Sequence, residues 1–263
     1  MDFKDHTILG RTGLSVSRLG IAASYGAPDP AIEMAFHEYG INFLYWGSRR
    51  KTGMRDAILN LKGSYRDKLV IAFQSYDKSG LFMRRFHEKG LRTLGIDCAD
   101  LLILGWMMGI PQGRMLETAM RLKEEGKVRY LAISSHNRSL VGDLIRRRDF
   151  PIDIYMIRYN AAHRGAETDI FSHIPTEDPP GLMSYTATRW GRLLEPKKMP
   201  PGEHPMTAAE CYRFVLTDPH VNLCMMGPRT ALEMEQGLTA LEGGPLSTEE
   251  MERARWIGDF VHG

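Results

Sequence analysis

Side chains that can move a proton or bind an anion follow directly on short apolar runs of this sequence. Tyr45 and His136 are the residues that we expect to transfer protons, because a phenol and an imidazole can each donate or accept one. The imidazole also titrates close to neutral pH. The side chains that we expect to contact a substrate are aromatic or basic: Trp46, Arg50, Tyr76, Trp106, Arg158 and Arg189. Each of these residues alone is more often explained by packing or solvation, but together they predict a positively charged, ring-lined site.

Arg158 indicates which ligand this site would take. It follows Met156 by two residues, so in a strand both side chains would point to the same face. If that face is the interior of a barrel, an arginine there needs an anionic partner. With Arg189 after a later apolar run, the pattern predicts a ligand that bears a carboxylate or phosphate and has an aromatic portion.

Short apolar runs alternate with amphipathic segments along the whole chain. The runs cover residues 18–23, 41–46, 69–74, 100–104, 128–134, 152–159, 181–186 and 221–226. This alternation is typical of parallel strands that are covered by helices. An open doubly wound sheet would give the same alternation, but its GxGxxG motif after a first strand is missing. We therefore predict an α/β protein with one (β/α)8 TIM barrel domain over residues 1–263, whose chemistry lies at the carboxyl ends of the strands.

Three helix starts are expected from capping boxes, in which a hydroxyl residue and a glutamate three positions later satisfy each other's free amides. The pairs are Thr207 with Glu210, Thr230 with Glu233, and Ser247 with Glu250.

Composition and charge narrow the expected partners. The net charge is only +2 and basic residues are interspersed with acidic ones, so we expect no nucleic acid partner. The cysteines Cys98, Cys211 and Cys224 lack CxxC or Cys-His spacing, which argues against disulfides and a metal site. No signal peptide or apolar run of membrane length is present, so we expect a cytoplasmic protein without membrane contact. A small-molecule substrate is the expected partner, and a homo-oligomer stays open.

The segment from Leu9 to Gly20 resembles the amino-terminal hairpin and first strand of aldo-keto reductases. Further similar segments follow in the family's order: residues 40–43 for the second strand, 66–72 for the third, 126–129 before the fifth, Tyr159-Asn160 at the sixth, and residues 227–230 for the eighth-strand cofactor loop. Their order and spacing identify the chain as similar to this superfamily, in a divergent bacterial type. The resemblance implies an amino-terminal β-hairpin before the barrel.

The resemblance also implies which positions should carry proton transfer. In the family a Tyr supplies the proton, a Lys paired with an Asp lowers the pKa of that Tyr, and a His orients the carbonyl. The matching positions are Tyr45 for the Asp, about Arg50 for the Tyr, Gln74 for the Lys and Gly105 for the His. None of the four is retained, which implies a rebuilt site. We expect Tyr45 and Gln74 to hydrogen-bond across the barrel floor, where the ion pair would stand.

The positions that hold NADP(H) in the family are mixed in this chain. Ser134 matches, but Ser135 and Met156 replace an Asn and a Gln. Tyr185 matches the ring stacked on the nicotinamide, and Thr186 the hydroxyl that follows it. Arg229 and Thr230 match the phosphate clamp, and an arginine beside a helix start is a sound phosphate site. The resemblance therefore implies NADP(H) as cofactor, bound with fewer contacts.

Three functions follow from these expectations. The first is an NADP(H)-linked oxidoreductase of the aldo-keto reductase type that acts with a rebuilt site on a small anionic or aromatic substrate. The second is a cofactor-independent lyase or isomerase that uses Tyr45, His136 and Arg158. The third is a non-catalytic binding protein, a pseudoenzyme that keeps a ligand or nucleotide pocket. Only the first requires a dinucleotide at Tyr185 and Arg229.

Overall fold

A closed ring of parallel strands forms the centre of the computed structural model, which describes residues 2–47 and 51–262. The ring order is β10-β3-β4-β5-β6-β7-β8-β9, and every neighbouring pair is parallel. The strands are β3 (Leu19–Ala22), β4 (Phe43–Trp46), β5 (Val70–Ser75), β6 (Ala99–Leu104), β7 (Val128–Ser135), β8 (Ile154–Arg158), β9 (Gly181–Tyr185) and β10 (Leu223–Met226). The predicted (β/α)8 barrel is confirmed, with strand ends within two residues of the apolar runs.

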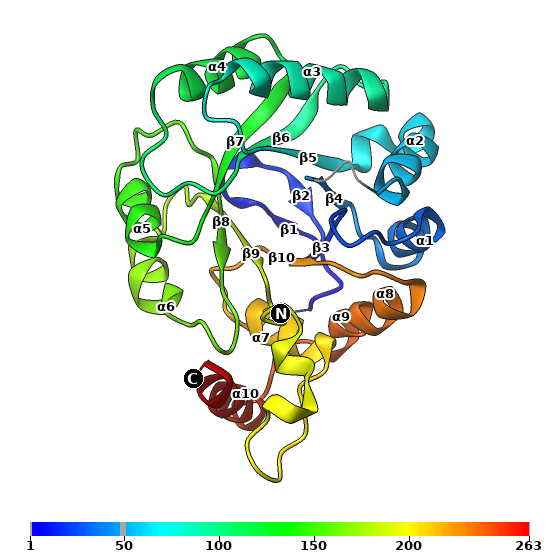
Figure 1. Ribbon diagram of the computed structural model, residues 1–263, viewed down its shortest axis with the longest axis vertical. Helices are drawn as coiled ribbons and strands as arrows, with labels where there is room; N and C mark the ends of the chain where they lie inside the picture. The colour runs from blue at the N-terminus through cyan, green and yellow to red at the C-terminus, as the bar shows by residue number, and fades with distance from the viewer. Residues whose placement is uncertain (1, 48–50, 263) are drawn as a thin grey trace.

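Helices surround this ring, as Figure 1 shows. They are α1 (Asp29–Tyr39), α2 (Gly53–Tyr65), α3 (Leu81–Leu94), α4 (Gly113–Glu124), α5 (Arg138–Arg146), α6 (Ala166–Asp169), α7 (Ala208–Thr217), α8 (Ala231–Leu238), α9 (Ala240–Gly243) and α10 (Thr248–His262). Short 3-10 turns are η1 (Gly10–Thr12), η2 (Arg66–Lys68), η3 (Phe171–His173), η4 (Arg192–Leu194) and η5 (Pro196–Lys198). Among the residues that the structure describes, no helix is long and apolar enough to cross a membrane.

An amino-terminal hairpin closes one end of the barrel. Its strands β1 (Thr7–Ile8) and β2 (Ser15–Val16) pair antiparallel, which confirms the predicted hairpin, and Figure 1 shows them across the centre of the ring. Leu9 and Leu14 pack with Phe43 and other inward side chains, so the hairpin seals the amino ends of the strands. Gly10 approaches Gly181 so closely that a Cβ would lie 2.2 Å from its nitrogen. The hairpin does not cover the carboxyl ends of the strands.

The buried side chains form two layers. The inner layer fills the barrel with one face of each strand, and the outer layer lies between strands and helices. Adjacent residues of a strand belong to different layers, so Tyr45 is in the inner cluster while Trp46 is in the outer one. This alternation decides which side chains reach the mouth of the barrel.

The expected capping boxes are present at two helix starts and altered at the third. Thr207 and Glu210 satisfy each other's amides at α7, as Ser247 and Glu250 do before α10. At α8 the Thr230 hydroxyl accepts from the amide of Glu233, but the Glu233 carboxylate accepts from the amide of Arg229 at 2.7 Å. The carboxylate therefore reaches one residue further back than in a reciprocal box.

Candidate active site

A pair of tyrosines stands at the carboxyl ends of β4 and β5. Tyr45 is only 7% exposed within the barrel, and its hydroxyl is hydrogen-bonded to that of Tyr76, which is 60% exposed on the loop after β5. Burial first, and then the neighbouring Tyr76 and Tyr185 hydroxyls, raise the pKa of Tyr45 well above its ordinary value. Gly47 permits this arrangement, because a Cβ there would lie 2.3 Å from the Tyr45 hydroxyl. The buried phenol stays neutral, and Tyr76 presents the hydroxyl that solvent reaches.

Gly105, just after β6, makes room for two of the site's side chains. A Cβ at Gly105 would lie 2.5 Å from Nε2 of Gln74 and 2.8 Å from the ring of Tyr76. The Lys78 ammonium donates to the Gly105 carbonyl at 2.7 Å and so fixes this short loop. The volume that a side chain at position 105 would occupy is therefore filled by Gln74 and Tyr76.

Gln74 takes a different partner from the one expected. Its Nε2 donates to Oγ of Ser134 at 3.3 Å, and the same hydroxyl accepts from the amide of Trp106 at 3.0 Å. The expected hydrogen bond between Tyr45 and Gln74 is therefore wrong, since Tyr45 pairs with Tyr76 instead. The other amide atom, Oε1 of Gln74, is buried without a partner. An acceptor buried without a partner costs free energy, and a donor from a bound molecule would offset that cost if the Gln74 amide turned toward it.

Ser135, the residue at the expected Asn position, serves the loops around the mouth. Its hydroxyl donates to the Met107 carbonyl at 2.6 Å and accepts from the amide of Asn137 at 2.9 Å. Ser135 is 3% exposed and thus lies beneath the surface of the site.

His136, Tyr185 and Arg158 meet on the opposite side of the barrel mouth. The rings of His136 and Tyr185 pack edge to face with centroids 5.5 Å apart. Arg158 pairs in register with Tyr185 and follows Met156, an inner-layer residue, by two positions. Burial and the charge of Arg158 lower the pKa of His136, so the imidazole is neutral at pH 7. The pKa of Tyr185 is raised, chiefly by burial.

The loop after β9 carries a buried arginine on an unusual backbone. Thr186, Arg189 and Trp190 have positive φ angles of 61°, 50° and 53°, a region that residues other than glycine rarely adopt. Arg189 is 8% exposed and donates from Nη2 to the His262 carbonyl of α10 at 3.1 Å. Its Nη1 is buried without a partner. Such local strain is common where a loop holds a ligand.

His163 lies close to Arg158 and Arg189. Burial, then the charges of Arg158 and Arg189, lower the pKa of His163 to about 4. Its ring stands 5.1 Å from the ring of His262, between centroids. We call Arg158, Arg189 and His163 the arginine cluster. No pattern in the sequence indicates the contact with His262, because it depends on how α10 returns to His163.

The carboxylates on the same loops and on α10 are engaged elsewhere. Asp169 pairs with Arg138 at 2.7 Å, Glu167 with Arg255 at 2.7 Å, and Asp259 with Arg164 at 2.6 Å. Within the two described ranges, no carboxylate pairs with Arg158 or Arg189. Among the residues that the structure describes, no ion pair therefore compensates the positive charge of the arginine cluster.

Arg229 and Thr230 stand apart from this cluster, at the end of β10. Arg229 is exposed, and its guanidinium lies 5.9 Å from the ring centroid of Tyr25. Gly227 allows the ring to approach, because a Cβ there would be 2.3 Å from it. The guanidinium has no acidic partner in the part of the chain that the structure describes. The Glu233 carboxylate near the helix start adds negative charge beside it.

The two tryptophans that were expected to contact a substrate differ in exposure. Trp46 is 3% exposed in the outer layer and packs against Phe73, so the structure corrects the expectation that it faces the mouth. Trp106 is 63% exposed on the loop after β6 with a φ of 52°. Arg50 lies outside the described residues.

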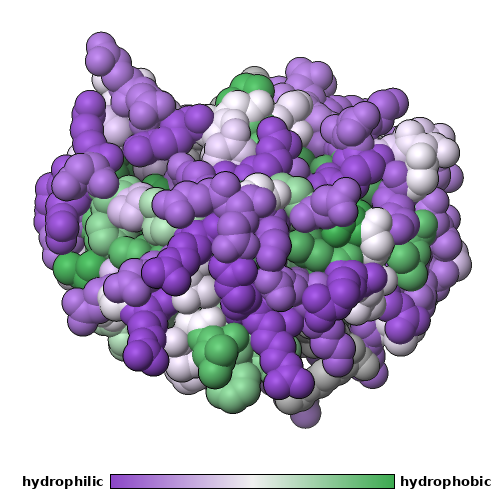
Figure 2. Space-filling view, turned by 90° about the horizontal axis from the view of Figure 1, so that it is seen from above, coloured by the Kyte–Doolittle hydropathy of each residue, from purple (hydrophilic) through white to green (hydrophobic). Residues whose placement is uncertain are grey.

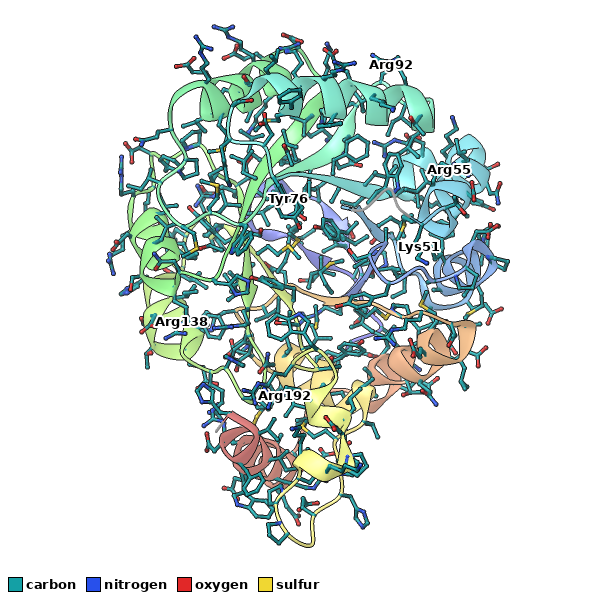
Figure 3. The ribbon with its side chains drawn as sticks, viewed as in Figure 1. Lys51, Arg55, Tyr76, Arg92, Arg138 and Arg192 are labelled. Atoms are coloured by element: carbon teal, nitrogen blue, oxygen red, sulfur yellow. The ribbon has the colours of Figure 1, made fainter. Side chains whose placement is uncertain are left out.

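The other end of the barrel holds two cavities of about 590 Å³ and 650 Å³. In the smaller one Asp100 accepts from Arg66 and Arg129 at 3.0 Å and 3.1 Å, and from the amide of Ile71. These groups satisfy one another and stabilise the amino ends of the strands. The carboxyl ends of the strands lie at the opposite end of the barrel, where Figure 3 shows Tyr76 toward the middle of the molecule.

Comparison with known proteins agrees with this architecture. Residues 30–210 match the model of the aldo/keto reductase family. An aldo-keto reductase from Klebsiella pneumoniae, solved in complex with NADP and acetate, superposes with a TM-score of 0.77 at 20% identity, covering 97% of this chain and 96% of that one. The apo form of an aldo-keto reductase from Bacillus halodurans gives a TM-score of 0.75 at 20% identity, with 96% and 95% covered. Because the family model spans well over half of its residues, the chain belongs to the aldo/keto reductase family.

Proposed function

We propose that the protein is an NADP(H)-linked oxidoreductase whose site is rebuilt around Tyr76 and Tyr45, and that it acts on a small anionic or aromatic substrate. The observation that carries this proposal is the hydrogen-bonded tyrosine pair at the mouth, with Tyr185 close by. Family membership and the structural similarity to a reductase solved with NADP support the cofactor. Fold alone would not support a function.

The residues at the mouth fit NADP(H) in part. Tyr185 supplies an aromatic face for the nicotinamide, and Oε1 of Gln74 is a free acceptor beside Ser134. Arg229, which forms no ion pair with a carboxylate of the described residues, supplies charge for a phosphate at the start of α8, next to the Thr230 hydroxyl. The Glu233 carboxylate works against a phosphate there, so we expect weaker binding than an arginine alone would give. Bound NADPH would supply a hydride to the substrate.

The protein's own residues would transfer the proton to the substrate. We assign the donor role to the exposed Tyr76 hydroxyl, because Tyr45 is enclosed and its raised pKa keeps it protonated as the partner of Tyr76. Gln74 positions the pair by filling the space beside Gly105. In the reverse direction the substrate returns its proton to Tyr76, and the neutral imidazole of His136 is the group at the mouth that would pass this proton to or from solvent. With no lysine assigned to activate the phenol, an imine or activated alkene suits this site better than an ordinary ketone.

Oxidation of NADPH with a panel of aldehydes, imines and enones tests the proposal. Tyr76→Phe should lower kcat about 100-fold or more if its hydroxyl is the general acid. Tyr39→Phe, at the end of α1 and remote from the mouth, is the matched control and should keep wild-type rates. If NADPH binds but no substrate of the panel oxidises it in the wild type, a non-catalytic binding protein replaces this proposal. If NADPH does not bind, a cofactor-independent lyase or isomerase at the same residues takes its place.

A further inference from the structure

We propose that Arg158 and Arg189, together with His163, bind a carboxylate group of the substrate, so that the substrate is a small carboxylic acid that also carries the reducible group. The reducible group rests on the proposed function, whereas carboxylate binding rests on the burial of Arg189 and on the place of Arg158 at the end of β8, with the charge of the arginine cluster as support.

Arg189 is built into the protein as an anion-binding group. Arg189 is 8% exposed as a whole residue, and its Nη1 is buried with no acceptor among the described residues. Nη2 donates to the carbonyl of His262, so the fork is held in one orientation by α10. A buried donor without a partner costs free energy, and an anion would remove that cost.

Arg158 places a second positive charge on the inner face of the barrel. It stands two residues beyond Met156 and in register with Tyr185, on the strand end nearest the mouth. Arg158 is close enough to Arg189 for its charge to lower the pKa of Arg189, after burial and the charge of Arg192. Two like charges held together without a carboxylate favour a bound anion.

The charged groups that lower the pKa of His163 are basic. The pKa of His163 is lowered to about 4 by burial and by Arg158, Arg189, His262 and Arg138. Each charged neighbour in that set is basic, and Arg138 is itself paired with Asp169. A neutral His163 remains as a hydrogen-bonding group beside the arginines.

A carboxylate on the substrate fits this place better than a cofactor phosphate does. The rings of His136 and Tyr185 lie next to Arg158 and would face the body of a small molecule. Arg229, by contrast, stands with Tyr25 at the end of β10 and already offers charge for a phosphate. A planar carboxylate also matches the two parallel N–H donors of a guanidinium.

Binding of benzoate, measured by calorimetry with and without NADP+, tests the inference on the full chain. Arg158→Met should weaken benzoate about 10- to 100-fold, the range for a charge-assisted hydrogen bond. Arg158→Lys keeps the charge but loses the fork, so an intermediate loss is expected. Arg92→Met is the matched control, because Arg92 is exposed on α3 at the periphery in Figure 3. Methyl benzoate, which lacks the charge, should not respond to any of these changes.

Turnover gives the second readout. Wild-type kcat/KM should favour 4-carboxybenzaldehyde over its methyl ester, and Arg158→Met should abolish that preference. Unchanged benzoate affinity in Arg158→Met would overturn the inference, as would a loss of NADPH affinity without a loss of benzoate affinity, which would assign the cluster to the cofactor. If benzoate binding depends on Arg158 but NADPH is never oxidised, the carboxylate site stands and the proposed function fails.

Discussion

The stability of the protein in mild acid should depend on His163 and on the arginine beside it. In the folded protein burial and the charges of Arg158 and Arg189 lower the pKa of His163 from 6.5 to about 4. Between these pH values the unfolded chain binds a proton that the folded chain does not, so stability is full above pH 6.5 and falls as the pH decreases toward 4. At ~1.4 kcal/mol per pKa unit the loss would reach about 3 kcal/mol. The ring is only half-buried, so solvent screening reduces this to about 1–2 kcal/mol.

Substitution of Arg158 isolates this contribution. In Arg158→Met the pKa of His163 should rise toward 6.5, so the variant should lose less stability than the wild type between pH 7 and pH 4.5. Burial, the largest cause, persists, and we expect a difference of about 1 kcal/mol between the two proteins. Acidic residues such as Glu88, whose pKa is lowered chiefly by its hydrogen bond to Lys127, also contribute less to the stability of the protein as the pH falls. They do so equally in both proteins and cancel in the comparison.

Urea unfolding at pH 7, 6, 5 and 4.5, with NMR titration of the His163 ring, measures both quantities. Arg92→Met, which removes an exposed arginine remote from the mouth, should follow the wild type at every pH. The reasoning is refuted if His163 titrates near 6.5 in the wild type, or if Arg158→Met leaves the pH dependence of unfolding unchanged.

Three further outcomes are expected. Asp100→Ala leaves two guanidinium groups without their shared partner at the amino ends of the strands, and should reduce the free energy of unfolding by about 3–5 kcal/mol in urea titrations; a loss under 1 kcal/mol would contradict the role of the buried carboxylate. Gly105→Ala pushes a Cβ against Gln74 and Tyr76, so the free energy of unfolding should fall by about 1–3 kcal/mol. The rate of NADPH oxidation should also fall, by more than the loss of folded protein accounts for. Unchanged kinetics would contradict a site in which these two side chains need that space. Thr207→Ala removes the cap of α7 and should lower stability by about 1 kcal/mol in thermal unfolding, with substrate kinetics unaffected.

The barrel could be predicted because its signal is local. Apolar runs and amphipathic segments alternate with the period that strands and helices require, and the strand ends agree within two residues. The same alternation predicts Arg158 on the face of Met156, and β8 includes both residues. Applied to Tyr45 and Trp46, it also shows that two adjacent strand residues cannot both face the mouth, which is why the expectation for Trp46 needed correction.

The partners within the site could not be predicted, because they depend on side-chain positions across neighbouring strands. Whether Gln74 reaches Tyr45 or Ser134 is decided by the space beside Gly105, which only the folded barrel defines. The burial of Arg189 depends on a loop of positive φ angles and on the return of α10. No residue spacing in the sequence indicates either feature.

Figure 2 shows a face covered mainly by hydrophilic residues, with small separate apolar patches between them. Scattered apolar groups of this kind are ordinary on protein surfaces and indicate no particular partner.

Fluorescence titration of the full chain with NADPH tests the central claim most directly. We predict saturable binding that Arg229→Ala weakens about tenfold, through loss of a charge-assisted contact to phosphate. No saturable change up to millimolar NADPH in the wild type would contradict the claim that this rebuilt site serves a nicotinamide cofactor.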